Sequence, residues 1–205
     1  MSLDLYLAFV AAACLLLVIP GPTVALVLGY ALGEGRRAAL FIVAGVALGD
    51  LTAMTLSLLG VGALLAASAT LFTVLKWIGA AYLIFLGIKL WRAPVGDGAA
   101  AATTTRSGRR MFAHAYIVTA LNPKSIAFFV AFVPQFMKPE LPYWPQAAIL
   151  IATFVTLAAI NALGYALLAS RARHIIRRPA VQRWVNRTGG TVLIGAGVMT
   201  ATLRR

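Results

Sequence analysis

The chain has 205 residues, of which 61% are hydrophobic and only 11% are charged. Soluble domains are about half apolar and about a quarter charged, so this composition excludes an ordinary soluble protein, a disordered chain and a fibrous repeat. The 18 Lys and Arg residues outnumber the 5 Asp and Glu residues. Because the basic residues fall mainly between apolar runs, we attribute them to membrane orientation and contact with anionic lipid, and expect no nucleic-acid partner.

The apolar runs predict an all-α membrane protein with six transmembrane helices. A spanning helix needs about 20 apolar residues, and the last of the six segments is the shortest. In chain order the segments are 3–32, 38–67, 71–91, 111–137, 145–170 and 188–203.

The loops between these segments alternate in charge. Of the 18 basic residues, 13 belong to the first, third and fifth loops when Lys89, at the end of the third segment, is counted with the third loop. The positive-inside rule places these three loops in the cytoplasm and both termini on the outer side. The third loop is rich in Ala, Gly and Thr, so we expect one membrane domain made of a first repeat (1–93), a cytoplasmic linker (94–110) and a second repeat (111–205).

Helix breakers interrupt the first and the fourth segment at matching places. Pro20-Gly21-Pro22 breaks the first and Asn122-Pro123 breaks the fourth, and Pro20 and Pro123 lie 103 residues apart, about half the chain. Three spans are an odd number, so a second copy of three would enter the membrane upside down. Broken helices one and four in two inverted repeats are typical of secondary transporters, whose site lies at the breaks. Prolines that merely kink a membrane helix are the alternative.

Asp50 and Lys124 are charges that an ordinary membrane span would not contain. Counted from Ala38 and from Phe112, near the cytoplasmic starts of the two segments, each lies 12 residues in, or about 18 Å deep at the rise of a helix. We therefore expect both to face the interior, close together or sharing a water-filled cavity. Asp50 would carry a proton or bind a substrate amine, while Lys124 or freed helix N-termini would meet a carboxylate. A static ion pair that locks the fold is the alternative.

Two further polar residues could belong to the same pathway. Asn161 lies deep in the fifth segment, where it either lines the cavity or bonds to a neighbouring helix. Asn122 either coordinates substrate or caps the half-helix after the break. The small-residue pairs Gly29/Gly33 and Gly45/Gly49 favour tight helix packing and leave a homodimer open.

Other classes of function lack their chemistry here. One cysteine and two distant histidines form no recognisable metal site, and we expect no cofactor. Without a phosphate-binding loop, ATP-driven transport within this chain is excluded. Ser125 and His114 lie three turns apart on one helix and form no hydrolytic dyad, so we do not expect an enzyme. Export of a metal cation and a non-transporting scaffold remain as alternatives.

The chain resembles, over nearly its whole length, the LysE/RhtB family of bacterial amino-acid exporters, which includes lysine exporters and homoserine/threonine efflux proteins. One departure is Ala39, where many members have Gly. The residues that carry the resemblance are Pro20-Gly21-Pro22, Gly29, Gly33, Gly35-Arg36-Arg37, Gly45 and Gly49-Asp50; Leu75-Lys76-Trp77-Ile78-Gly79-Ala80-Ala81-Tyr82-Leu83 and Gly87; and Leu121-Asn122-Pro123-Lys124, Phe128-Phe129 and Pro134-Gln135-Phe136.

The resemblance implies export of an amino acid or a close derivative across the bacterial inner membrane, by exchange with protons. It places the pathway around the breaks and the two buried charges, and it leaves the substrate open. The residues expected along the substrate and proton pathway are Pro20, Gly21, Pro22, Asp50, Asn122, Pro123, Lys124 and Asn161.

Overall fold

The computed structural model describes residues 1–19, 21–34, 36–93, 107–176 and 178–202. Pro20 and most of the expected linker therefore lie outside the described residues. Every regular element in the described ranges is helical, as expected. The elements are α1 (Leu3–Val18), α2 (Pro22–Glu34), α3 (Arg36–Ala67), α4 (Ala69–Trp91), α5 (Gly108–Ala120), α6 (Pro123–Ala127), a π-helical turn η1 (Phe128–Phe132), a 3-10 turn η2 (Val133–Phe136), α7 (Tyr143–Ile176) and α8 (Pro179–Thr202).

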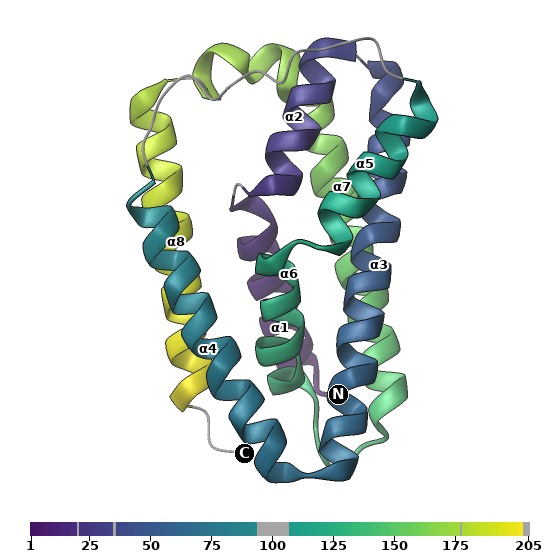
Figure 1. Cartoon of the computed structure of the whole chain (residues 1–205), viewed down its shortest axis with the longest axis vertical. Helices are drawn as coiled ribbons and strands as arrows, with labels where there is room; N and C mark the ends of the chain where they lie inside the picture. Colours follow the sequence, from purple (N-terminus) through teal and green to yellow (C-terminus); the bar gives the residue numbers. More distant parts are fainter. Residues whose placement is uncertain (20, 35, 94–106, 177, 203–205) are drawn as a thin grey trace.

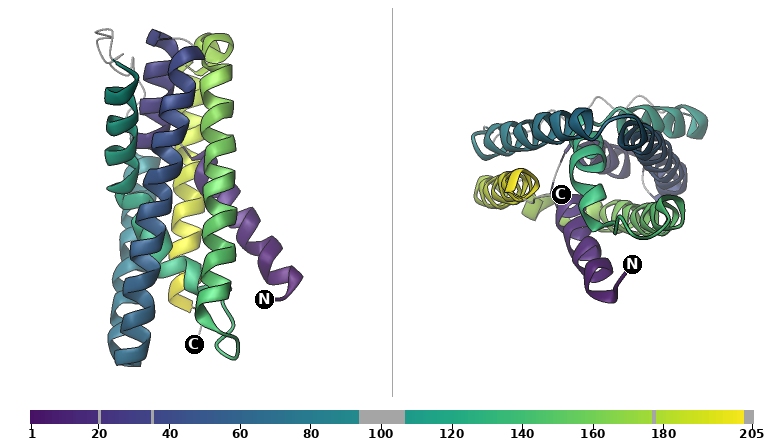
Figure 2. Two further views of the ribbon diagram at one scale, coloured as in Figure 1. Left: turned by 90° about the vertical axis from the view of Figure 1, so that its right-hand side faces the viewer. Right: turned by 90° about the horizontal axis from the view of Figure 1, so that it is seen from below.

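The helices form an elongated bundle in which α1 and α2 run one way along the long axis, and the direction then alternates through α3, α4, the pair α5–α6, α7 and α8 (Figure 1). The amino-terminal end of α1 and the carboxy-terminal end of α8 lie at the same end of the bundle. Helices α4 and α8 lie side by side as a pair, while α3 packs on α5 and α7. The amino-terminal half of α1 tilts away from the other helices (Figure 2), and the axes of α1 and α2 differ by 58°.

Four helical stretches in the described residues are long and apolar enough to cross a membrane, and the bent pair α1–α2 makes a fifth if it counts as one span. The four are Ala39–Leu64, Thr70–Trp91, Gly108–Phe136 and Tyr143–Ala169. Helix α8 does not belong to this set. It also begins at Pro179, nine residues before the expected start at 188, because proline suits the first turn of a helix and the basic stretch that follows continues the same helix.

The stretch from α5 to η2 is one apolar segment with two departures from α-helix. It breaks at Leu121–Asn122 and then widens into the π turn before tightening into the 3-10 turn. Pro134 lies in the 3-10 turn and has no N–H to donate to an earlier carbonyl, which explains the second irregularity. The first break was expected from the sequence, and the π turn was not.

Two hydrophobic clusters fill the interior and differ in the size of their side chains. The first is rich in large aromatic residues, including Phe9, Phe128, Phe129, Phe132 and Phe154. The rings of Phe129 and Phe154 meet edge to face with centroids 4.9 Å apart. The second cluster lies among α2, α3, α5 and α7 and consists mostly of alanine and valine. A cavity lies where the two clusters meet, because its lining includes members of both.

Candidate functional site at the two helix breaks

The two breaks, about a hundred residues apart in the chain, are joined by side-chain hydrogen bonds. Asn122 caps α6 by accepting a hydrogen bond from the backbone N–H of Lys124 at 3.1 Å. The same side chain donates through Nδ2 to Oγ1 of Thr23, in the first turn of α2, at 3.2 Å. The Thr23 hydroxyl lies 3.3 Å from the hydroxyl of Thr119, in the last turn of α5. Asn122 is thus both a cap and a link between the broken helices, and it is only 3% exposed.

The carboxy-terminal end of α1 is completed by side chains from other helices. A helix leaves its last four carbonyls without partners inside the helix, and in a membrane no water replaces them. Leu16 and Ile19 accept hydrogen bonds from Nζ of Lys124 at 3.0 and 2.9 Å, Leu17 accepts from Nδ2 of Asn161 at 3.1 Å, and Val18 accepts from Oη of Tyr165 at 3.0 Å. These three side chains hold the end of α1 to α6 and α7.

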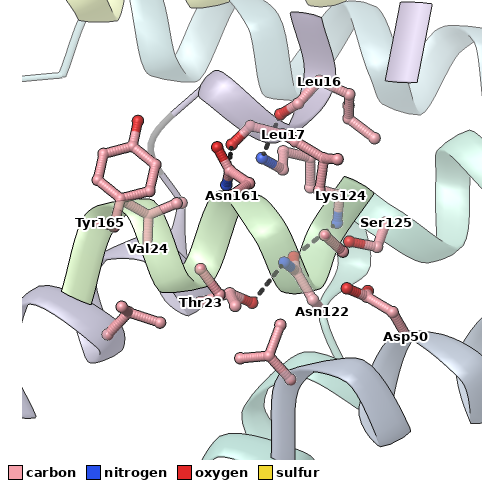
Figure 3. A pocket seen from close by; sticks show the side chains of 15 residues that line it. Leu16, Leu17, Thr23, Val24, Asp50, Asn122, Lys124, Ser125, Asn161 and Tyr165 are labelled. Carbon is pink, nitrogen blue, oxygen red and sulfur yellow. Dashed lines mark hydrogen bonds between the residues drawn. The ribbon is translucent and has the colours of Figure 1, made fainter. Parts of the chain in front are cut away.

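A cavity lies between the two breaks, as Figure 3 shows. Its volume is about 30 Å³, which is room for about two water molecules. Five of the residues expected along the pathway line it: Gly21, Asp50, Asn122, Lys124 and Asn161. The structure therefore brings the acid, the base and both breaks to one place, although the cavity is too small to hold an amino acid.

The Asp50 carboxylate points from α3 into this cavity (Figure 3), and the residue is 3% exposed. Among the described residues, no side chain or backbone group donates a hydrogen bond to it, and no cation forms an ion pair with it within 4 Å. Lys124 interacts with it electrostatically across the cavity. The Lys124 ammonium thus lies on carbonyl oxygens of α1, while the carboxylate beside it has no direct partner.

The prolines of the breaks occupy different places from the polar residues. Pro22 and Pro123 are the first residues of α2 and α6, their side chains are exposed, and neither lines the cavity. Their effect on the site is indirect, because each ends a helix and lets the neighbouring backbone turn inward. The expected pathway position Pro20 lies outside the described residues.

Sequence reasoning missed three polar residues of the cavity: Thr23, Ser125 and Tyr165. Each had a signal in its spacing. Thr23 directly follows the first break and Ser125 lies three residues after Asn122, while Tyr165 lies four residues after Asn161. Positions four apart share one face of a helix, so Tyr165 extends the row that Asn161 begins.

The profile of a family described as LysE type translocators matches residues 14–203. The chain belongs to the LysE translocator family. This membership confirms the resemblance found in the sequence and identifies the chain as a multi-pass membrane protein of a transporter family. The breaks and the two buried charges all lie within the part that the family profile covers.

Relatives of this LysE family chain align over almost their full lengths. An uncharacterized membrane protein of Vibrio cholerae serotype O1 is 37% identical, with 100% of both chains covered. A homoserine/homoserine lactone efflux protein of Salmonella typhimurium is 33% identical, covering 100% of this chain and 99% of the relative. A leucine efflux protein of Salmonella choleraesuis is 28% identical, covering 97% and 95%. No solved structure matches the chain significantly.

Proposed function

We propose that this protein is a secondary active exporter of an amino acid or a close derivative, located in the bacterial inner membrane and exchanging its substrate for protons. The observation that carries the proposal is one buried cavity, between two broken helices, that contains both Asp50 and Lys124. Family membership and relatives named as homoserine and leucine efflux proteins support the direction and the substrate class.

The chemistry of the cavity suits a zwitterion. An amino acid brings one ammonium and one carboxylate, and both must be matched when they leave water. Lys124 and the N–H groups in the first turns of α2 and α6 suit the carboxylate, while Asp50 suits the ammonium or a proton in its place. Because the same carboxylate serves two cations that exclude each other, substrate and proton would occupy the site in turn.

We further propose that the chain consists of two inverted repeats of three spans each, 1–93 and 111–205 joined by the linker 94–110, with α8 as the sixth span. Reciprocal contacts between α4 and α8 support this. A methyl group on Gly87 would lie 2.6 Å from the carbonyl oxygen of Gly190, and one on Gly197 would lie 2.7 Å from that of Ala80. Ala80 and Gly190, like Gly87 and Gly197, are 110 positions apart, as expected for a twofold relation.

Asp50 and Asn161 fit the same relation, because they are 111 positions apart and line the same cavity from α3 and α7. In such transporters one repeat rocks against the other around a fixed central site. Movement of α1 relative to α7 would widen the cavity and would break the hydrogen bonds of Asn161 and Tyr165, which join these two helices.

Replacement of the two charges tests the proposal. We expect Asp50→Asn and Lys124→Ala each to abolish export of toxic amino-acid analogues from cells, measured as loss of resistance and of extracellular accumulation. In proteoliposomes, an imposed pH gradient should accelerate transport by the unaltered protein and have no effect on Asp50→Asn. Glu140→Gln and Lys138→Ala are matched controls, because both side chains are exposed outside the cavity.

Full transport by well-folded Asp50→Asn and Lys124→Ala variants would contradict the site. Transport of no amino acid by the unaltered protein, in cells and in proteoliposomes, would contradict the function itself.

A further inference from the structure

The end of α1 already binds an ammonium group. Nζ of Lys124 lies 3.0 Å from the carbonyl oxygen of Leu16 and 2.9 Å from that of Ile19. The carboxy-terminal end of a helix carries a partial negative charge, which favours cations. The primary ammonium of Lys124 is the same chemical group as the α-ammonium of an amino acid, so the two carbonyls form a site of the right chemistry for a ligand amine.

The Lys124 side chain reaches this site past the first break. A methyl group on Gly21 would lie 3.5 Å from Nζ and 3.6 Å from Cε of Lys124. The ammonium therefore lies directly beside the backbone of the break and inside the cavity that Gly21 and Lys124 both line. A ligand in this cavity therefore meets two carbonyls that the Lys124 ammonium already occupies.

A second acceptor for that ammonium lies across the same cavity. The Asp50 carboxylate is buried and accepts no hydrogen bond from the described residues, whereas the α1 carbonyls are occupied. A buried carboxylate without a direct partner is costly in a membrane. Lys124 can therefore leave α1 for Asp50 without leaving the cavity, and its departure would free the two carbonyls.

We propose that the carbonyls of Leu16 and Ile19 form the binding site for the ligand's primary ammonium, and that the Lys124 ammonium occupies this site until a ligand displaces it. The displaced Lys124 then pairs with the ligand's carboxylate, or with Asp50 when the ligand has none. This inference rests on the proposed export function and changes one part of it: the ligand's ammonium binds the α1 carbonyls, and Asp50 serves the proton and the displaced Lys124 instead. It defines the ligand class as compounds with a free primary ammonium, for which a carboxylate is dispensable.

Three versions of one ligand test the inference on the unaltered protein. The parent is the amino acid with the strongest counterflow in proteoliposomes among the twenty standard ones and homoserine. Its methyl ester keeps the ammonium and loses the carboxylate, while its N-acetyl derivative does the reverse. We expect the ester to bind at least about tenfold more tightly than the N-acetyl derivative, which corresponds to one lost charge-assisted contact. A smaller ratio, or the reverse order, would overturn the inference.

Lys124→Met provides a second, independent readout because methionine keeps an unbranched stem without the ammonium. If Lys124 competes for the ammonium site, its removal should tighten binding of the methyl ester, since the ligand no longer displaces an internal group. A purely structural Lys124 would give unchanged or weaker ester binding in the folded variant, and that result would also overturn the inference. Lys138→Met is the matched control, because the Lys138 side chain is exposed away from the cavity.

The two proposals fail in different ways. If no amino acid gives counterflow with the unaltered protein, the export function is wrong. If counterflow is present and the ester shows no advantage over the N-acetyl derivative, export stands and the ammonium site at α1 is wrong. The analogue series needs no variant, so it decides the question even if Lys124→Met does not fold.

Discussion

The end of α1 shows how single side chains make a broken helix tolerable in a membrane. An unsatisfied carbonyl in hydrocarbon costs several kcal/mol, and α1 presents four of them near the middle of the bundle. Lys124 satisfies two, while Asn161 and Tyr165 satisfy one each. All three donors come from the second half of the chain, so the fold and the site depend on the same hydrogen bonds.

Tyr165→Phe isolates one of these bonds, because it removes the hydroxyl and keeps the ring. The loss of one hydrogen bond between membrane helices costs about 0.6 kcal/mol on average, so we expect only a slight decrease in thermal stability in detergent. The rate of export should fall about threefold, because a free-energy change of about 0.6 kcal/mol in the state that holds the end of α1 to α7 corresponds to that factor. Both quantities are measurable on the same preparation.

Tyr6→Phe is the control for this comparison. The Tyr6 hydroxyl lies 3.2 Å from that of Thr153, and it also joins α1 to α7, but it does not line the cavity. We expect the same small loss of stability without loss of export. If Tyr6→Phe reduced export as much as Tyr165→Phe, the effect would belong to α1–α7 packing in general.

The sequence allowed part of this site to be predicted, because charges at membrane depth are rare and have few explanations. Asp50 and Lys124 lie on one cavity, as their equal depth led us to expect. The sequence did not predict that Lys124 binds carbonyls of α1 and lies beyond ion-pair distance of Asp50. Backbone carbonyls that accept hydrogen bonds have no signature in a sequence. The sequence therefore suggested a direct contact between the two charged side chains.

At the scale of elements, the close crossing of α3 and α5 depends on two glycines of α3. A methyl group on Gly45 would lie 2.5 Å from the carbonyl oxygen of Phe112, and one on Gly49 would lie 2.9 Å from that of Tyr116. Gly45 and Gly49 therefore serve helix packing within the chain. At Gly29, by contrast, an added methyl group would meet no described atom within 4 Å. The small-residue pattern therefore identified a packing face within the chain at Gly45/Gly49.

Gly49→Ala tests this crossing. Backbone atoms of α5 cannot move aside as a flexible side chain can, so the variant must push the two helices apart. Overpacking of this kind costs about 1–3 kcal/mol, and we expect a clearly lower melting temperature in detergent. Export should fall too, because Asp50 follows Gly49 directly and would shift with it.

Gly60→Ala is the control on the same helix. An added methyl group there would meet no described atom within 4 Å. Alanine favours helix over glycine by about 0.8–1 kcal/mol, so this variant should be as stable as the unaltered protein or slightly more so. Equal melting temperatures for Gly49→Ala and Gly60→Ala would contradict the close crossing.

The boundaries of elements were harder to predict than their existence. Breaks at Gly21-Pro22 and Asn122-Pro123 were visible because proline ends helices for a local reason. The start of α8 at Pro179 was not visible in the sequence. The segment from 179 to 187 is basic and polar, and a hydropathy pattern identifies only the apolar part of a helix. Tertiary contacts, such as Arg187 lying over the ring of Trp91 at 5.2 Å, hold this polar turn in helical form.

At the scale of the whole molecule, we expect the basic residues to set the orientation of the bundle in the membrane. The ends of α1 and α8 lie at one end of the bundle (Figure 1). The basic residues Arg92 and Arg183 belong to the opposite end, near the close of α4 and the start of α8. Attraction to anionic lipid would keep that end at the cytoplasmic face, as the positive-inside rule also predicts. Exchange for protons would then carry substrate toward the end at which the chain begins.

Cysteine labelling tests this orientation in intact cells. Cys14→Ser first removes the single native cysteine. We expect a membrane-impermeant maleimide to label a cysteine introduced by Glu140→Cys, in the exposed turn between η2 and α7. It should not label one introduced by Arg92→Cys, at the exposed end of α4, until the cells are permeabilised. The reverse pattern would invert the molecule in the membrane, whereas equal labelling of both positions in intact cells would contradict a fixed orientation. Lys124 and Asp50 lie between these two positions. The labelling result therefore also identifies which end of the bundle must open to release the substrate outside the cell.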